Sequence, residues 1–208
     1  MRKKVIIFDL DNTIYPVASI GNELFAPLYD LILQDVNHTA NINKIKAEIM
    51  RRPFQLVARD FHFSDKLIAD GIALLKDITY QGKIEPFDDY RLTTPLPQDK
   101  FLVTTGFLKL QQSKIDGMKI SPHFKAIHIV DPATSTLTKK DVFAGIIQQH
   151  RYTKEEVLVV GDDLHSEIKA AQDLGIDVVL YDKLGMYNGV TNMMKINDFG
   201  ELIDLLQH

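Results

Sequence analysis

The 208-residue chain contains no cysteine. The fold can therefore use neither disulfide bonds nor thiolate metal ligands, and nothing indicates an oxidising compartment. No apolar run approaches the roughly 20 residues that are needed to span a bilayer. The basic residues 1–4 lead into the apolar run Val5–Phe8, but that run stops at Asp9, short of the apolar region of a secretory signal. We expect a cytoplasmic protein with no membrane partner.

The chain also lacks an excess of cations. Lys and Arg total 24 against 28 Asp and Glu, for a formal charge of −4. A nucleic-acid partner is disfavoured, because neutralising a phosphate backbone requires clustered cations. The composition, with 45% hydrophobic and 25% charged residues, is ordinary for a globular protein. The length fits one large domain, or a catalytic domain with a smaller insert.

Five short apolar runs have the pattern of strands buried on both faces, as in parallel sheets. They are Val5–Phe8, Phe101–Thr104, Ala126–Val130, Val157–Val160 and Val178–Tyr181. Helical patterns connect the later runs, with Ser166 as an expected N-cap and Gly175 just past a helix end; they cover Phe107–Lys119, Asp141–His150 and Ser166–Leu174. This alternation predicts an α/β fold with a Rossmann-like, doubly wound parallel sheet.

The region after the first strand breaks the alternation. From about Val17 to Gln81 the apolar residues recur at helical spacing, in about four helices, and Ser64 is a predicted N-cap. We predict an inserted all-helical domain over residues 16–92, with residues 1–15 and 93–208 forming the catalytic core. Prolines at 86, 95 and 97 mark the return to the core.

Two acids follow the first predicted strand, in Phe8-Asp9-Leu10-Asp11-Asn12-Thr13. Sites on open parallel sheets gather at the carboxyl ends of strands, and alternation lets Asp9 and Asp11 project towards one pocket. Two close carboxylates repel each other, and a cation usually offsets that repulsion. The alternative is a pair of ordinary loop acids, one of which caps the next element.

A second acidic group closes the fourth predicted strand. Gly161 permits a tight turn, Asp162 and Asp163 follow it, and Glu167 lies in the next helix. If strands one and four are neighbours, Asp162 lies near Asp9, and oxygen ligands from two strands suit Mg²⁺. The alternative is that the two aspartates form a turn and Glu167 favours a helix N-terminus.

Two weaker signals lie at corresponding places. Thr104 ends the second predicted strand, where a hydroxyl can bind a phosphate oxygen. Lys139 and Lys140 open the helix before strand four, where a cation opposes the helix dipole unless an anion is bound nearby. Alone, a strand-end threonine or an exposed lysine is usually neither ligand nor catalyst.

Taken together and in this order, the four signals resemble the haloacid dehalogenase (HAD) superfamily of phosphohydrolases. Its pattern is DxDxT, a strand-end Thr or Ser, a Lys, and GDxxxxD. In this chain these positions are Asp9, Asp11 and Thr13; Thr104; Lys139 or Lys140; and Gly161, Asp162 and Glu167. The helical insert lies where that family has its C1 cap, and residues 8–16 look like the opening of pyrimidine 5′-nucleotidase-type members.

The resemblance implies a Mg²⁺-dependent phosphatase acting on a small-molecule phosphate monoester, such as a nucleotide or sugar phosphate. Asp9 would be the nucleophile and form an aspartyl-phosphate, and Asp11 would be the general acid and base. Thr104 and Lys139 (alternatively Lys140) would bind the phosphoryl oxygens. The metal ligands would be Asp9, the Asp11 carbonyl and Asp162, supported by Thr13, Asp163 and Glu167.

Four departures from the pattern stand out. Glu167 replaces an Asp, Thr105 replaces a common Asn, no Pro-Asp follows the lysine, and residues 90–100 are short of the helix that commonly precedes the second strand. A phosphomutase shares all four motifs and is the alternative enzyme. A non-catalytic binding module would lose one of the key residues, and a receiver-like phosphoacceptor would lack the helical insert.

The insert carries several cations that could bind a second anionic group of a substrate, although solvated cations on helices are the usual case. They are Arg51, Arg52, Arg59 and Lys66. His62, between two phenylalanines, is expected to pack rather than to react. The substrate, the oligomeric state and the choice between Lys139 and Lys140 stay open at this point.

Overall fold

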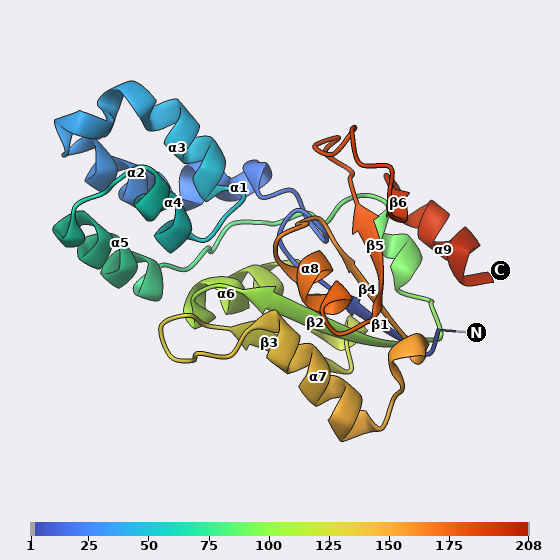
Figure 1. Cartoon of the computed structure of the whole chain (residues 1–208). Helices are drawn as coiled ribbons and strands as arrows, with labels where there is room; N and C mark the ends of the chain where they lie inside the picture. Colours follow the sequence, from blue (N-terminus) through green and yellow to red (C-terminus); the bar gives the residue numbers. More distant parts are fainter. Residues whose placement is uncertain (1–2, 208) are drawn as a thin grey trace.

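The computed structural model describes residues 3–207, so Met1 and Arg2 of the basic start lie outside it. Six parallel strands form one sheet in the order β3-β2-β1-β4-β5-β6 (Figure 1). They are β1 (Val5–Phe8), β2 (Asp99–Thr105), β3 (Ala126–Val130), β4 (Val157–Gly161), β5 (Asp177–Tyr181) and β6 (Lys195–Ile196). The five predicted strands are confirmed. The sequence pattern missed β6, because two residues cannot show a periodicity.

Helices cover both faces of this sheet. Four α-helices follow β2 in the described chain: α6 (Leu108–Met118), α7 (Lys139–His150), α8 (Glu167–Gln172) and α9 (Phe199–Gln207). Apolar side chains of α6 and α9 pack in one core cluster with Phe8 and Val160, while those of α7 and α8 pack in a second cluster with Ile7 and Val159. Neighbouring strand residues point to opposite faces, so the sheet is doubly wound, as predicted.

Between β1 and β2 the chain forms a helical cap. Its helices gather as a group beside the sheet (Figure 1); they are α1 (Ala18–Leu24), α2 (Ala26–Leu33), α3 (Ile42–Ile49), α4 (Phe54–Asp60) and α5 (Asp65–Asp77). A 3₁₀ turn, η1 (Val36–Asn41), joins α2 to α3. All of them lie within the range 16–92 expected for the insert, and the division into two domains stays a prediction. Within residues 3–207, every helix is too short or too polar to cross a bilayer.

Three of the helix boundaries test the predicted caps. Ser64 caps α5 as predicted, with its hydroxyl accepting a hydrogen bond from the Leu67 amide at 3.2 Å. Gly175 follows α8 with a φ of +71°, a conformation that glycine adopts freely. Ser166 occupies the N-cap position of α8, as predicted, but its side chain makes no cap hydrogen bond; the Glu167 carboxylate instead accepts from the Asp163 amide at 2.6 Å.

A buried aspartate ties the returning chain to the far side of the sheet. Asp89, only 5% exposed, accepts hydrogen bonds from the Tyr181 hydroxyl at 3.0 and 2.9 Å and from the Phe199 amide at 3.0 Å. The Lys183 ammonium lies 3.1 Å away and balances the charge. One carboxylate thus joins the strand β5, the start of α9 and the segment that returns from the cap.

We predict that Asp89→Ala lowers the free energy of unfolding by about 2–4 kcal/mol, because a buried hydroxyl and a buried amide lose their acceptor. The adjacent Asp88 has a side chain 94% exposed and serves as the matched control. Asp88→Ala should stay within about 0.5 kcal/mol of the parent. Urea denaturation of the three proteins measures both values, and equal stabilities would contradict the role of Asp89.

Candidate active site

The pairing of β1 with β4 brings the two acidic motifs together. The strands run in register from Val5 opposite Val157 to Phe8 opposite Val160, and the Asp9 amide donates to the Val160 carbonyl at 3.0 Å. Asp9 and Asp162 are the next residues with side chains beyond this register. Carboxylate oxygens of Asp9, Asp162 and Glu167 all lie within 4.8 Å of one another. Strands β1 and β4 are therefore neighbours, which is the condition on which the predicted closeness of Asp9 and Asp162 depended.

A buried lysine lies within this acidic cluster. The Lys139 ammonium is 2.5 Å from Asp9 Oδ1 and 2.7 Å from Glu167 Oε2, and the side chain is 7% exposed. Lys140 is exposed, so the structure brings the first of the two candidate lysines to Asp9. The helix α7 begins at Lys139, two residues earlier than predicted, because Thr138 and Asp141 form a capping box. That cap fixes the backbone that presents the lysine.

The negative charges of the three carboxylates are crowded in this cluster, and Lys139 offsets only part of them. Burial, partly offset by Lys139 and reinforced by Glu167, raises the pKa of Asp9 from 3.8 to about 7. Burial and the neighbouring Glu167 and Asp9 also raise the pKa of Asp162 well above its ordinary value. Three close carboxylates with one lysine leave a net negative, oxygen-rich site, which is the chemistry that Mg²⁺ requires. The residues present therefore fit a divalent cation.

Glu167 approaches the strand end only because residue 161 has no side chain. A Cβ at Gly161 would lie 2.6 Å from Glu167 Cδ, closer than two carbon atoms can approach. The glycine that ends β4 therefore makes room for the glutamate that holds Lys139. The sequence pattern predicted Gly161 as a turn former and did not predict this packing role.

The carboxylate of Asp11 is held by a different set of side chains. Its Oδ1 accepts from the Tyr15 hydroxyl at 2.6 Å and from Lys114 at 2.8 Å; its Oδ2 accepts from Gln111 at 2.9 Å and from Lys114 at 3.1 Å. Burial alone would raise the pKa of Asp11, but Lys114, Tyr15 and Gln111 together lower it below its ordinary value. Asp11 is thereby anchored to the helix α6 and to the loop after β1.

Gln111 and Lys114 were not predicted from the sequence. Both are buried on α6, at 1% and 3% exposure, beside the apolar Leu110 and Ile115. The sequence did contain a signal for them: a glutamine and a lysine lie three residues apart on the apolar stripe of an amphipathic helix. Such residues are rarely buried without polar partners, so their position there indicates a polar site. The apolar spacing of α6 predicts the helix but does not indicate these two polar residues.

The remaining predicted residues lie around these two groups. The Thr104 hydroxyl, at the end of β2, accepts from the Gln111 amide at 2.6 Å. Thr13 is fully buried, and its hydroxyl has no hydrogen-bond partner among residues 3–207. Asp163 accepts from the His165 amide at 2.7 Å and so shapes the loop before α8. Their expected roles stay predictions.

Most side chains of both groups line one open cleft between the sheet and the cap, which holds about 900 Å³ when the solvent at its open mouth is included; Thr13 and Tyr15 are not among the lining residues. The cap contributes mainly apolar residues, among them Phe25, Ile49 and Phe54. Of the cap cations considered above, Arg51 and Arg52 line the cleft, and Arg52 is paired with Glu48 and Asp60. Arg59 pairs with Asp60, and Lys66 pairs with Asp70.

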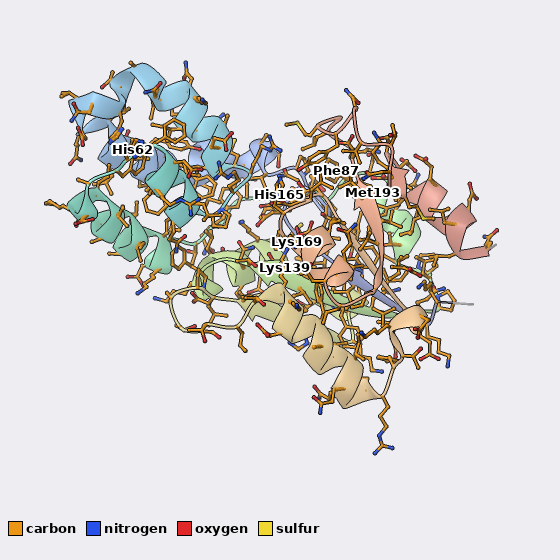
Figure 2. All side chains as sticks on the ribbon, in the orientation of Figure 1. His62, Phe87, Lys139, His165, Lys169 and Met193 are labelled. Carbon is orange, nitrogen blue, oxygen red and sulfur yellow. The ribbon has the colours of Figure 1, made fainter. Side chains whose placement is uncertain are left out.

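His62 lies outside this cleft. Figure 2 shows it out in the cap, away from Lys139. Its side chain is exposed and its φ is +56°, in the turn after α4. The expectation that His62 packs is therefore wrong, because the turn directs its side chain to solvent while the neighbouring Phe63 is buried.

Comparisons with known proteins agree with this geometry. The sequence model of haloacid dehalogenase-like hydrolases matches residues 3–175. No curated protein matches the chain by sequence. Similar solved structures cover nearly the whole of both chains. They include YfnB from Bacillus subtilis, bound to magnesium (18% identity, 100% of each chain, TM-score 0.68). A HAD phosphatase from Thermococcus onnurineus is 19% identical over 98% of this chain and 97% of its own (TM-score 0.66). The L-2-haloacid dehalogenase from Xanthobacter autotrophicus is 14% identical over 99% and 98% (TM-score 0.61). At these identities the likeness concerns the fold.

The raised pKa of Asp9 predicts how stability depends on pH when no metal is bound. Between about pH 4 and pH 7 the folded chain keeps a proton on Asp9 that the unfolded chain has released. The contribution of this group to stability therefore falls as the pH rises through that window. Asp9→Asn cannot ionise and so does not lose this stability at high pH. We therefore expect the substitution to raise the melting temperature by a few degrees at pH 8.

At pH 5 the gain should be much smaller, because protonated aspartic acid and asparagine are both neutral. Thermal denaturation in chelator at the two pH values measures the difference. The exposed Asp88→Asn is the control and should show no such pH dependence. An equal shift for Asp9→Asn at both pH values would contradict the charge crowding.

Proposed function

Because the chain belongs to the haloacid dehalogenase-like hydrolase family, we propose that it is a Mg²⁺-dependent phosphatase of small-molecule phosphate monoesters. The observation that carries the proposal is the pairing of a buried Asp9–Lys139 cluster with a second carboxylate, Asp11, two residues further along. A phosphatase needs both a nucleophile and a proton donor for the leaving group. A dehalogenase expels halide, which needs no proton, so Asp11 favours phosphoryl transfer.

In the first step, Asp9 attacks phosphorus in line, the ester oxygen leaves, and an aspartyl-phosphate forms. The Lys139 ammonium is 2.5 Å from the nucleophile, and we assign it to neutralising the charge that develops on the phosphoryl oxygens. The Thr104 hydroxyl, at the end of the neighbouring strand β2, is the second group that we assign to those oxygens. Both residues bind and orient the substrate, which supplies much of the catalysis in phosphoryl transfer.

Asp11 moves the protons in both steps. It donates a proton to the departing alkoxide, and then accepts one from the water that hydrolyses the aspartyl-phosphate. Asp11 has to carry a proton when the ester binds, and the anionic phosphoryl group beside it favours that form. The first step leaves the carboxyl ionised, so the same group can then accept the proton of the water. A residue without a protonatable side chain could not take this part.

Asp9 and Asp162 would hold the metal through their side chains, with the Asp11 carbonyl as a third ligand. Glu167, whose carboxylate lies in the same cluster, would support the site through Lys139 and the Asp163 amide. When bound, Mg²⁺ offsets the repulsion between a carboxylate nucleophile and an anionic substrate. That a similar fold, YfnB, was solved bound to magnesium supports this choice of metal.

The cap determines which ester is accepted, since it forms the apolar wall of the cleft opposite Asp9. Nucleotides and sugar phosphates are the first candidates. The assignment to nucleotidases rests only on the resemblance of residues 8–16. The alternative of a phosphomutase would differ in its product, which would be an isomeric phosphate ester instead of inorganic phosphate.

A panel of phosphate monoesters assayed for inorganic phosphate tests the proposal. Turnover should require Mg²⁺, stop in excess chelator and return when Mg²⁺ is restored. Asp9→Asn should reduce it to below about 1% of the parent, because a lost nucleophile normally costs several orders of magnitude. Full activity in chelator, or in Asp9→Asn, would refute the proposed site. Isomer formation without phosphate release would indicate a mutase, and no turnover of any ester would indicate a binding module.

The part assigned to Asp11 predicts a dependence on the leaving group. Nitrophenolate leaves without a proton, whereas an alkoxide needs one. Asp11→Asn should therefore slow phosphorylation by an alkyl phosphate far more than by nitrophenyl phosphate, and should slow hydrolysis of the aspartyl-phosphate in both cases.

Rapid-quench kinetics of Asp11→Asn should then show a burst of phosphoenzyme with the aryl ester and little with the alkyl ester. Parent enzyme assayed with both esters is the reference. Equal losses in the two phosphorylation steps would mean that Asp11 holds the loop or the metal and moves no proton.

A further inference from the structure

The proposed mechanism leaves one buried cation of the cleft without a part. Lys114, from the middle of α6, has a side chain 4% exposed and lies against both oxygens of Asp11, at 2.8 and 3.1 Å. It is not one of the four motif residues of the resemblance. The cleft thus contains two buried pairs, Asp9 with Lys139 and Asp11 with Lys114. Burying a lysine lowers the stability of the fold unless the ammonium group is paired and hydrogen-bonded. We therefore expect Lys114 to have a role in the site.

Gln111 completes the surroundings of Asp11 and connects them to the phosphate-binding side. Its amide nitrogen lies 2.9 Å from Asp11 Oδ2 and 2.6 Å from the Thr104 hydroxyl, and its carbonyl oxygen accepts from Lys114 at 2.7 Å. Because both hydrogens of one amide group are directed at these two acceptors, the side chain has a single orientation. Gln111 thereby fixes the spacing between Asp11 and Thr104.

The backbone leaves room for this arrangement. A Cβ at Gly106 would lie 2.8 Å from Gln111 Cγ and 2.9 Å from its Cδ, so a side chain at position 106 would displace Gln111. From the other side, the loop after β1 brings the Tyr15 hydroxyl to Asp11 Oδ1 at 2.6 Å. Two elements therefore converge on one carboxylate: the loop after β1 through Tyr15, and α6 through Gln111 and Lys114.

We infer that Lys114 and Gln111 are positioning residues that orient the Asp11 carboxylate for proton transfer to the leaving group and from water. The inference rests on the proposed function, since it assigns the orientation of the same acid and base. A carboxylate can rotate about its Cβ–Cγ bond, and three contacts from the packed helix α6 with a fourth from Tyr15 remove that freedom. Orientation of this kind matters because a displacement of about 1 Å at a reacting group can cost about 100-fold in rate.

Lys114→Met tests the inference, since methionine keeps the unbranched apolar stem and removes the ammonium group. We expect kcat for alkyl phosphates to fall about 10- to 100-fold with KM within about threefold. Phosphorylation by nitrophenyl phosphate should fall much less, because its leaving group needs no proton. Gln111→Met should show the same pattern. The matched control is Lys109→Met on the same helix, whose ammonium pairs with Asp77 at the surface and whose alkyl-to-aryl ratio should equal that of the parent.

A double-mutant cycle separates orientation from general destabilisation. If Lys114 acts through Asp11, then Lys114→Met should add less than about twofold to the loss already caused by Asp11→Asn. If the double variant instead loses activity by the product of the two single losses, the inference is overturned. It is also overturned if Lys114→Met leaves the ratio of alkyl to aryl phosphate turnover unchanged. The rise in melting temperature caused by Mg²⁺ is measured in each variant and should persist in Lys114→Met, which shows that the site is folded.

Failure of the proposed function gives a different result. A parent enzyme without turnover of any phosphate ester would refute the phosphatase itself. An active parent whose Lys114→Met variant behaves like Lys109→Met would refute only the positioning of Asp11.

Discussion

The parallel register of β1 against β4 is the constraint on which the rest of the site depends. It places Asp9 and Asp162 beyond adjacent strand ends and, with Glu167 from α8, concentrates three carboxylates within 4.8 Å. Such crowding costs stability, as the raised pKa of Asp9 indicates. Lys139 offsets only part of the charge. The remaining negative charge is what makes the place suited to a divalent cation and, with it, to an anionic substrate.

The two aspartates of the first motif are treated differently by their surroundings. Asp9 lies among other acids, so burial and repulsion raise its pKa, whereas Lys114, Tyr15 and Gln111 surround Asp11 with donors and lower its pKa. Carboxylates whose environments push their pKa values apart are a common basis for dividing chemical roles. Without metal and substrate the two directions are opposite to the roles that we propose, because a nucleophile has to be ionised and a general acid has to be protonated. Bound Mg²⁺ would favour the ionised form of Asp9, and an anionic phosphoryl group beside Asp11 would favour its protonated form.

Several parts of this molecule were predictable because they depend on local patterns. The buried strands show apolar runs, the helical cap shows a 3.6-residue period, and Ser64 marks a helix start in the usual way. Asp9, Asp162 and the lysine pair 139–140 were predicted as site residues because each follows a strand end or opens a helix, where parallel sheets gather their sites. Short features were not predicted: β6 has only two residues, and at the start of α8 it is Glu167, rather than the N-cap Ser166, that accepts a backbone hydrogen bond.

The sequence by itself determined the sheet, the inserted helices and the acidic residues at the strand ends, because periodicity and motif order are local properties. Only the tertiary structure decided that Lys139, and not Lys140, reaches Asp9, since that depends on where the capping box starts α7. It alone brought Lys114 and Gln111, about a hundred residues away in the chain, to Asp11. Such contacts join side chains on separate elements, and no spacing along the sequence encodes the distance between them.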